Sequence, residues 1–284
     1  MRKLLMCASI VLTSTTVFGN NISQPTFHSR ITWGSDAAKG EFPFYVGVLI
    51  NTEDGLKQFC GGTLIDKQWV LTAAHCINTD VNKVLLQIGR EEFGSQTDEN
   101  TYRITQAIRH PSYLHDDSGA PDYYNHTDDI GLYKLEKPVP PEIYADIINL
   151  YNSDKPADGE QFTVIGMGRT ETGLWKKRLQ KTRVQIDDSS QGCHAWGFDE
   201  NKDICARSIS QAIDHISNIS NGDSGGPILM FDKNGQPYQV GITSRSGHTD
   251  SEDMAFPAYH YPYAAFTYIP SYINWINEQK ARFQ

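Results

Sequence analysis

A single serine stands among glycines in the stretch Asn221–Pro227, whose sequence is Asn-Gly-Asp-Ser-Gly-Gly-Pro. Glycine adopts positive φ values and lets other atoms approach the backbone closely. A hydroxyl on such a turn stands clear of its neighbours, and the backbone N–H groups around it are free to bind an anion. This arrangement suits a nucleophile, Ser224, beside an oxyanion hole. The same residue types are also common in surface turns, so the hypothesis requires a base and an acid elsewhere.

Two other segments offer residues for these roles. His75 follows the apolar segment Leu71–Ala74 and precedes Cys76, and imidazole is the natural base for a serine near neutral pH. Its small neighbours leave space for a partner, although a histidine at this place can also be a core residue. Asp129 directly precedes the apolar segment that starts at Ile130, so its carboxylate can be drawn inward to fix the tautomer of the imidazole.

Short strands separated by turns must position these residues. Their β-branched and aromatic content and their regular spacing predict an all-β sandwich or barrel. The segment from Pro138 to Leu150 is typical of a connector between two halves, and Ser271 is predicted to cap one long helix, Tyr272–Arg282. The predicted strands are Phe44–Asn51, Gly62–Ile65, Trp69–Ala73, Lys83–Ile88, Tyr102–Ile108, Ile130–Leu135, Phe162–Gly166, Leu174–Ile186, Pro227–Phe231, Gln239–Ser244 and Ala264–Ile269.

The charge of the chain argues against one class of partner. The net charge is −9 over 284 residues. All 34 acidic residues follow Arg30, and three of the 25 basic residues, Arg2, Lys3 and Arg30, lie within the first thirty positions. An acidic surface repels phosphate backbones and anionic lipid, so no nucleic acid is expected as a partner. The length allows one large hydrophobic core or two small ones.

The first residues are typical of an export signal. Arg2 and Lys3 precede the apolar segment Leu4–Leu12, and Val17–Gly19 offers a cleavage site. The alternative is an N-terminal core helix. No later segment is long and apolar enough to span a membrane. We therefore predict a signal peptide over residues 1–19 and a secreted protein, extracellular or periplasmic.

The cysteine count agrees with export. Cys7 lies in the predicted signal peptide, which leaves four cysteines. An even number in an exported chain favours two disulfides. Four cysteines permit three pairings, of which we predict the local one, Cys60–Cys76 and Cys193–Cys205. Zinc binding is the weaker alternative, because neither pair has the tight spacing of a metal knuckle.

Together these segments resemble the trypsin/chymotrypsin family of serine endopeptidases. The resemblance extends from Arg30 to the C-terminal helix, and it implies two packed six-stranded antiparallel β-barrels with a C-terminal helix. The implied peptidase domain is 31–284, with a first barrel at about 31–145 and a second at about 146–284, after a propeptide at 20–30. The motifs occur in the family's order: Arg30–Ile31, Ala-Ala-His-Cys, Asp-Ile-Gly-Leu, Gly166–Gly168, Gly-Asp-Ser-Gly-Gly-Pro and Tyr-Ile-Asn-Trp-Ile.

The resemblance also implies a reaction. Ser224 would be the nucleophile, His75 the general base and acid, and Asp129 the residue that orients the histidine. The backbone N–H groups of Gly222 and Ser224 would form the oxyanion hole. An acyl-enzyme at Ser224 would then be hydrolysed by water. No organic cofactor and no metal are required.

Activation follows from the same resemblance. Cleavage after Arg30 would free an α-ammonium group on Ile31, which would pair with Asp223, since a buried carboxylate without a partner costs on the order of several kcal/mol. The alternative is that Arg30 is a solvated leader residue. The implied partners are protein or peptide substrates, an activating protease and protein inhibitors, and the expected state is a monomer.

The substrate-binding region departs from the family pattern. Ser244, Arg245 and Ser246 match the strand that binds the peptide substrate, with arginine where an aromatic residue is expected. This arginine either selects an acidic residue in the substrate or is solvated. Asn218 stands at the base of the pocket in place of aspartate, which argues against cleavage after basic residues. If the register differs, Asp214 reaches the pocket instead.

Other departures concern crosslinks and metals. Phe162 and Met230 stand where relatives often carry a cysteine pair, and contact between an aromatic ring and methionine can replace that crosslink. Arg90 stands where a calcium ligand is expected, so no strong calcium site is predicted. The acidic segment 115–126 is better interpreted as a solvated loop than as a chelating site, whose ligands would be His110, His115, His126, Asp116, Asp117 and Asp122.

Two other classes of protein agree less well with the sequence. A catalytically silent binding module of the same fold is the alternative to an enzyme, although silent members usually lose a residue of the catalytic triad. A plain structural β-protein leaves the coincidence of motifs unexplained.

Overall fold

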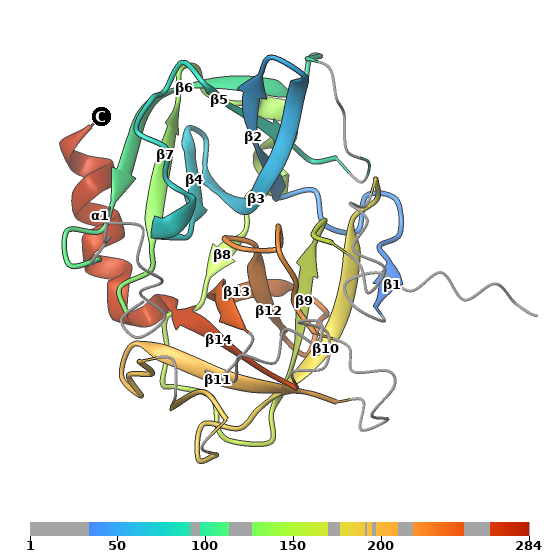
Figure 1. Cartoon of the computed structure of the whole chain (residues 1–284), viewed down its shortest axis with the longest axis vertical. Helices are drawn as coiled ribbons and strands as arrows, with labels where there is room; N and C mark the ends of the chain where they lie inside the picture. Colours follow the sequence, from blue (N-terminus) through green and yellow to red (C-terminus); the bar gives the residue numbers. More distant parts are fainter. Residues whose placement is uncertain are drawn as a thin grey trace, which may run out of the picture.

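A computed structural model describes residues 34–90, 92, 97–113, 127–169, 177–190, 192–194, 197–209, 218–246 and 262–283. These residues form mostly β-strands, arranged in two closed barrels that lie one above the other in Figure 1. The predicted all-β fold with two six-stranded antiparallel barrels and a C-terminal helix is confirmed. Over these described ranges, no helix is long and apolar enough to cross a membrane.

The first barrel closes in the order β2-β3-β4-β7-β6-β5, and each neighbouring pair is antiparallel. Apolar side chains fill its interior, among them Val48, Leu64 and Leu132, which are fully buried. Its strands are β2 (Tyr45–Thr52), β3 (Gly55–Asp66), β4 (Trp69–Thr72), β5 (Val84–Ile88), β6 (Thr101–Arg109) and β7 (Gly131–Leu135).

The second barrel closes in the order β9-β10-β11-β14-β13-β12, because β12 also pairs with β9. Two short strands extend its sheet: β1 (Ser35–Asp36) pairs with β10, and β8 (Asn149–Leu150) runs parallel to β13. The barrel strands are β9 (Gln161–Gly166), β10 (Gln180–Ile186), β11 (Asp203–Ser208), β12 (Pro227–Phe231), β13 (Pro237–Ser246) and β14 (Tyr263–Tyr268).

Strand boundaries differ from the prediction in several places, among them β3, which begins at Gly55 rather than at Gly62. Strand β11 was not predicted, because its first residue, Asp203, is a fully buried charged side chain that interrupts the apolar pattern. Strand β10 begins at Gln180 rather than at Leu174. Strand β8 lies at the end of the segment that was predicted to be a connector.

The C-terminal helix α1 (Ile273–Arg282) belongs to the second half of the chain but packs against the first barrel, beside β6 and β7 in Figure 1. Ile276 is buried in the core of that barrel, as the pattern predicts. The prediction that Ser271 caps this helix is wrong. The chain enters α1 through the 3-10 turn Ile269–Tyr272, so Ser271 lies inside this turn, where its hydroxyl donates to the carbonyl of Asn201 at 2.6 Å.

Both predicted disulfides are present. Cys60 of β3 is bonded to Cys76, and Cys193 is bonded to Cys205 of β11. The second barrel also gains packing where a further crosslink was considered: Phe162 is buried in its core, and Met230 packs against the same cluster. The barrels are therefore fixed by covalent bonds at two sites and by apolar packing elsewhere.

Candidate active site

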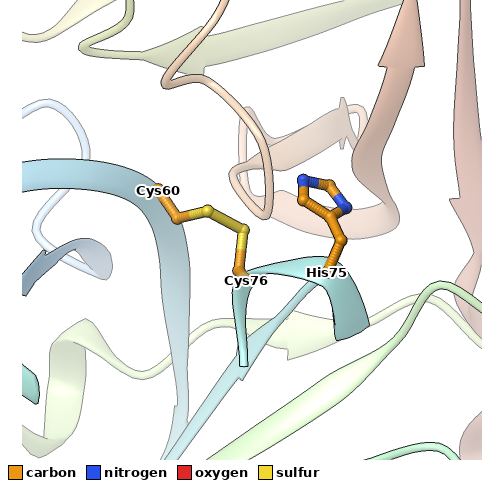
Figure 2. A group of neighbouring side chains, drawn as sticks. All are labelled: Cys60, His75 and Cys76. Carbon is orange, nitrogen blue, oxygen red and sulfur yellow. A yellow bond between two sulfur atoms is a disulfide. The ribbon is translucent and has the colours of Figure 1, made fainter. Parts of the chain in front are cut away.

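His75 lies on a short 3-10 turn, η1 (Ala74–Cys76), just after β4. The turn is held at its C-terminal end, because the disulfide ties Cys76 to Cys60 and the guanidinium of Arg109 donates to the carbonyl of Ile77 at 2.8 Å. Figure 2 shows the imidazole beside the disulfide and separate from it. The side chain of His75 keeps 29% of its surface exposed. The turn therefore fixes the backbone and leaves part of the ring accessible.

Asp129 binds His75 at two points. Its Oδ1 accepts the backbone N–H of His75 at 2.9 Å, and its Oδ2 lies 2.7 Å from Nδ1 of the ring. Oδ2 also accepts the hydroxyl of Ser244 at 2.6 Å, and the backbone carbonyl of Asp129 accepts the hydroxyl of Thr267 at 2.9 Å. The fold thus brings together the predicted base, the predicted acid and a residue of the predicted substrate-binding strand.

The electrostatics of this pair follow from burial and contact. Burial opposes the ionised form of Asp129, but the charge and hydrogen bonds of His75 and the hydroxyl of Ser244 prevail and lower its pKa to about 2. Burial likewise opposes the charged form of His75, and the charge and hydrogen bond of Asp129 prevail and raise its pKa. An ionised carboxylate only accepts hydrogen bonds, so Nδ1 carries a proton and Nε2 is left for a hydroxyl partner.

Ser224 lies on a turn between the two barrels. Its carbonyl accepts the backbone N–H of Gly61 in β3 at 2.7 Å, and Gly61 follows the cysteine that anchors the histidine turn. The next residue, Gly225, adopts a φ of 79°, and a Cβ there would lie 2.2 Å from the hydroxyl oxygen of Thr72. Only glycine therefore lets this turn dock against β3 and β4.

The predicted oxyanion donors lie on this turn. Gly222 adopts a φ of 99°, a conformation that favours glycine. Among the described residues, the N–H groups of Gly222 and Ser224 have no hydrogen-bond acceptor, whereas those of Asp223, Gly225 and Gly226 each donate to a carbonyl. Backbone N–H groups with no internal acceptor are suited to bind an anionic oxygen.

Asp223 is fully buried beneath the turn. Its two carboxylate oxygens accept the backbone N–H groups of Gly168 at 2.7 Å and Ser220 at 2.8 Å. Burial raises the pKa of Asp223 to about 7, against the opposing effect of these two hydrogen bonds. Within the described ranges it forms no ion pair with a side chain. Arg30 and Ile31, the predicted activation residues, lie outside these ranges.

Asn218, the predicted base of the specificity pocket, is almost fully buried, with 1% of its surface exposed. Its Nδ2 donates to the carbonyl of Tyr263 at 3.1 Å, and its Oδ1 accepts the backbone N–H of Ile219 at 2.8 Å. The amide is therefore engaged within the protein. Asp214, the alternative pocket residue, lies outside the described residues, and Ser246 is partly exposed at the end of β13.

Arg245 is not solvated, and that interpretation is wrong. Its guanidinium forms an ion pair with Asp203 at 2.6 Å, and the two side chains are only 9% and 0% exposed. The charge of Arg245 is thus matched inside the protein, which argues against the interpretation that Arg245 selects an acidic residue in the substrate. Sequence reasoning missed Asp203 because β11 was not predicted.

A second charged contact was also missed. Lys202, the neighbour of Asp203, lies 2.9 Å from Oδ2 of Asp128, the neighbour of Asp129. Asp128 is a non-glycine residue with a φ of 62°, a conformation that aspartate tolerates better than most residues. The adjacent acids at 128 and 129 were a visible signal, but their partners come from a distant part of the chain.

Neither of two potential metal sites among the described residues suits a metal. Sulfur and nitrogen atoms of Cys60, His75 and Cys76 lie close together, but the sulfurs are joined in a disulfide and cannot act as thiolate ligands. In the loop that resembles a calcium site, Arg90 forms an ion pair with Asp98, so an internal cation already neutralises this carboxylate. His115 and His126 lie outside the described residues.

Comparisons with known proteins agree with the geometry. The family model for trypsin matches residues 31–276. The chain is 27% identical over 270 residues to phenoloxidase-activating factor 1 of Holotrichia diomphalia, covering 87% of this chain and 69% of that protein. It is 31% identical over 252 residues to coagulation factor IX of Oryctolagus cuniculus, covering 87% and 83%. It is also 27% identical over 268 residues to CLIP domain-containing serine protease B9 of Anopheles gambiae, covering 87% and 62%. This chain therefore belongs to the trypsin family of serine proteases.

Proposed function

We propose that this protein is a secreted serine endopeptidase, made as a zymogen and activated by cleavage after Arg30. The observation that carries the proposal is the buried carboxyl group of Asp129, which binds both the backbone and the ring of His75. A structural β-protein has no need for a partly exposed imidazole held against a buried carboxylate. The same carboxylate accepts the hydroxyl of Ser244, as expected for a site that lies between two barrels.

In the proposed reaction, Nε2 of His75 takes the proton from the hydroxyl of Ser224 while the serine oxygen attacks the carbonyl carbon of the substrate. Asp129 holds Nδ1–H and stabilises the imidazolium that forms. The negative oxygen of the tetrahedral intermediate is bound by the N–H groups of Gly222 and Ser224, and one such donor contributes about 2.7–4 kcal/mol to the transition state. His75 then protonates the leaving amine, and water hydrolyses the acyl-enzyme.

The proposed activation uses the buried carboxylate of Asp223. Its pKa of about 7 reflects burial that two backbone N–H groups do not offset. An α-ammonium group on Ile31 would supply the missing positive charge and draw the proton off the carboxylate. Because Asp223 lies between the two oxyanion donors, this pairing would fix the turn on which they stand.

The partners we propose are extracellular proteins cleaved at selected sites. The relatives include a phenoloxidase-activating factor and a coagulation factor, names that indicate action on other proteins. An activating protease and protein inhibitors complete the expected set of partners. The predicted segments, a signal peptide at 1–19 and a propeptide at 20–30, fit this secreted form.

Covalent labelling tests the proposal. Protein with its N-terminus confirmed at Ile31 is treated with a fluorophosphonate, and we expect labelling of Ser224, identified by mass spectrometry. Ser224→Ala is the control for labelling elsewhere. A processed protein that is not labelled would contradict the proposal and support a catalytically silent binding module of the same fold.

A further inference from the structure

A buried ion pair lies directly behind the acid of the proposed triad. Nη2 of Arg245 is 2.6 Å from Oδ2 of Asp203, and both side chains are almost completely removed from water. Burying two charges costs more than their attraction returns unless further hydrogen bonds are made. One of those further hydrogen bonds is made by the other terminal nitrogen of the guanidinium, Nη1.

A continuous line of contacts leads from this pair to His75. Nη1 of Arg245 donates to Oγ of Ser244 at 3.2 Å, and the Ser244 hydroxyl donates to Oδ2 of Asp129 at 2.6 Å. The same Oδ2 is 2.7 Å from Nδ1 of His75. Four polar contacts therefore join Asp203 to the proposed general base.

An irregularity in β13 makes these contacts possible. Its pairing with β14 shifts register between Thr243 and Arg245. Such a bulge changes the direction in which neighbouring side chains point. Here it lets two adjacent residues, Ser244 and Arg245, both turn inward toward Asp129 and Asp203.

The residues that precede Asp203 and Asp129 in the sequence, Lys202 and Asp128, also contact each other. Lys202 pairs with Asp128 at 2.9 Å, and the hydroxyl of Tyr272 donates to the other oxygen of Asp128 at 3.1 Å. The dipeptide Lys202–Asp203 of the second barrel thus holds the dipeptide Asp128–Asp129 of the first. Lys202 contacts Asp128 directly, whereas Asp203 is connected to Asp129 through Arg245 and Ser244.

We propose that Arg245 and Asp203 are positioning residues, which fix the hydroxyl of Ser244 on Asp129 and so hold Asp129 against His75. The proposal deepens the proposed function and rests on it. A serine hydroxyl has one proton to donate and two lone pairs to accept with. Because Arg245 occupies a lone pair of Ser244 Oγ, the hydroxyl proton is directed at the carboxylate. Asp203 in turn holds the guanidinium in place and matches its charge.

The charges around the imidazole give this arrangement a measurable signature. Burial and the positive charges of Arg245 and Arg109 lower the pKa of His75, whereas Asp129 raises it. These are the described charged groups that act on the ring, from β13, β6 and the segment before β7. The negative charge of Asp203 offsets the positive charge of Arg245. Removing Arg245 or Asp203 should therefore move the pKa of His75 in opposite directions.

The test is an NMR titration of His75 in histidine-labelled protein, in the Ser224→Ala background to prevent self-cleavage. We expect Arg245→Met to raise the pKa of His75 and Asp203→Asn to lower it. Shifts of the same sign, or no shift in either variant, would overturn the proposal. Arg245 also acts on the ring through its charge alone, so a variant that removes both charges is needed to isolate the effect of positioning.

A double variant separates positioning from stability. Arg245→Met/Asp203→Leu replaces the buried pair by apolar side chains, a change that is often neutral or stabilising, so we expect the Tm of the wild type. With Ser224 intact, we expect kcat to fall roughly 10- to 100-fold at an unchanged KM, since small misplacements of catalytic groups have effects of this size. Wild-type kcat in this stable double variant would overturn the proposal.

The proposed function and this inference are tested by separate experiments. Fluorophosphonate labelling of the processed wild-type protein decides whether Ser224 is a nucleophile. The titration of His75 needs no turnover, so it decides whether Arg245 and Asp203 act on the histidine even in a protein that is never labelled.

Discussion

The backbone N–H of Gly168 donates to Oδ1 of Asp223 at 2.7 Å, and the missing side chain of Gly168 is what allows this contact. A Cβ at this position would lie 2.7 Å from three atoms of the carboxyl group. Gly166 is closer still, with its Cβ position 2.1 Å from Oδ1. Two glycines therefore form the floor on which the buried acid lies.

Adding a methyl group to this floor should damage both stability and activity. We expect Gly168→Ala to lower the free energy of unfolding by about 1–3 kcal/mol, the usual cost of overpacking, and to reduce labelling of Ser224. Urea unfolding and fluorophosphonate labelling measure the two effects. Gly47→Ala is the control, because its Cβ would lie at an ordinary distance of 3.4 Å from its nearest neighbour. Equal effects in the two variants would contradict this account.

The uncleaved precursor should lose stability as the pH rises from about 4 to about 7. Burial raises the pKa of Asp223 to about 7 in the folded chain, whereas an unfolded aspartate ionises near 3.9. Between these values the unfolded state releases a proton that the folded state keeps, which favours unfolding by on the order of a few kcal/mol.

Urea unfolding of the Arg30→Gln precursor at several pH values between 4.5 and 7.5 measures this effect. The matched control is the same precursor with Asp223→Asn, which should show a flatter dependence. A precursor whose stability is independent of Asp223 over this range would show that the carboxyl group already has a cationic partner.

Blocking the predicted processing site should leave the protein inactive. We expect Arg30→Gln to give an intact precursor without peptidase activity, because no α-ammonium group on Ile31 is released to pair with Asp223. Gel electrophoresis and hydrolysis of a mixed peptide library measure the two properties. Full activity in a precursor that is demonstrably uncleaved would exclude this activation mechanism.

The pH dependence of activity should report the coupling of His75 to Asp129. The raised pKa of His75 places the acid limb of the kcat/KM profile above pH 6.5, the ordinary value for histidine. Asp129→Asn removes the charge that raises this pKa, so the acid limb should move to lower pH. The expected loss of kcat is about 10⁴-fold, the magnitude established for the triad of this same family. An unchanged acid limb would assign the titration to another group.

Calcium should not stabilise this protein. Arg90 already pairs with Asp98 in the loop that resembles a calcium site, and a divalent ion would have to compete with this internal cation. We expect the same Tm in calcium and in a chelator, measured by thermal unfolding. Arg90→Glu restores a carboxylate and is the variant in which added calcium should raise the Tm. A lower Tm of the wild type in chelator would contradict the prediction.

The catalytic candidates could be predicted because each one lies in a contiguous motif. Ser224 with its glycines, His75 before a cysteine and Asp129 before an apolar strand carry their chemistry in adjacent residues. The all-β class and the local disulfide pairing followed from short-range patterns, whereas the two-barrel fold was implied by the resemblance to the family. The family, the fold and the two disulfides are the predictions that the comparisons and the structure confirm.

The contacts behind the site could not be predicted, because they depend on register and on distant pairs. Arg245 meets Asp203 only because β13 shifts register beside it and because β11 carries a buried charge. Its neighbour Lys202 reaches Asp128 across 74 positions of sequence. Ser271 was misassigned for a local reason, since a proline within the 3-10 turn moved the start of the helix past it.

The two ends of the described chain exchange sides. Strand β1 precedes the first barrel yet pairs with β10 of the second, and α1 follows the second barrel yet packs against the first. Each half of the chain is therefore held to the other by its terminal segment, β1 or α1. Removal of either segment should therefore loosen the packing of one half on the other, so that Ser224 and His75 lose their alignment before either barrel unfolds.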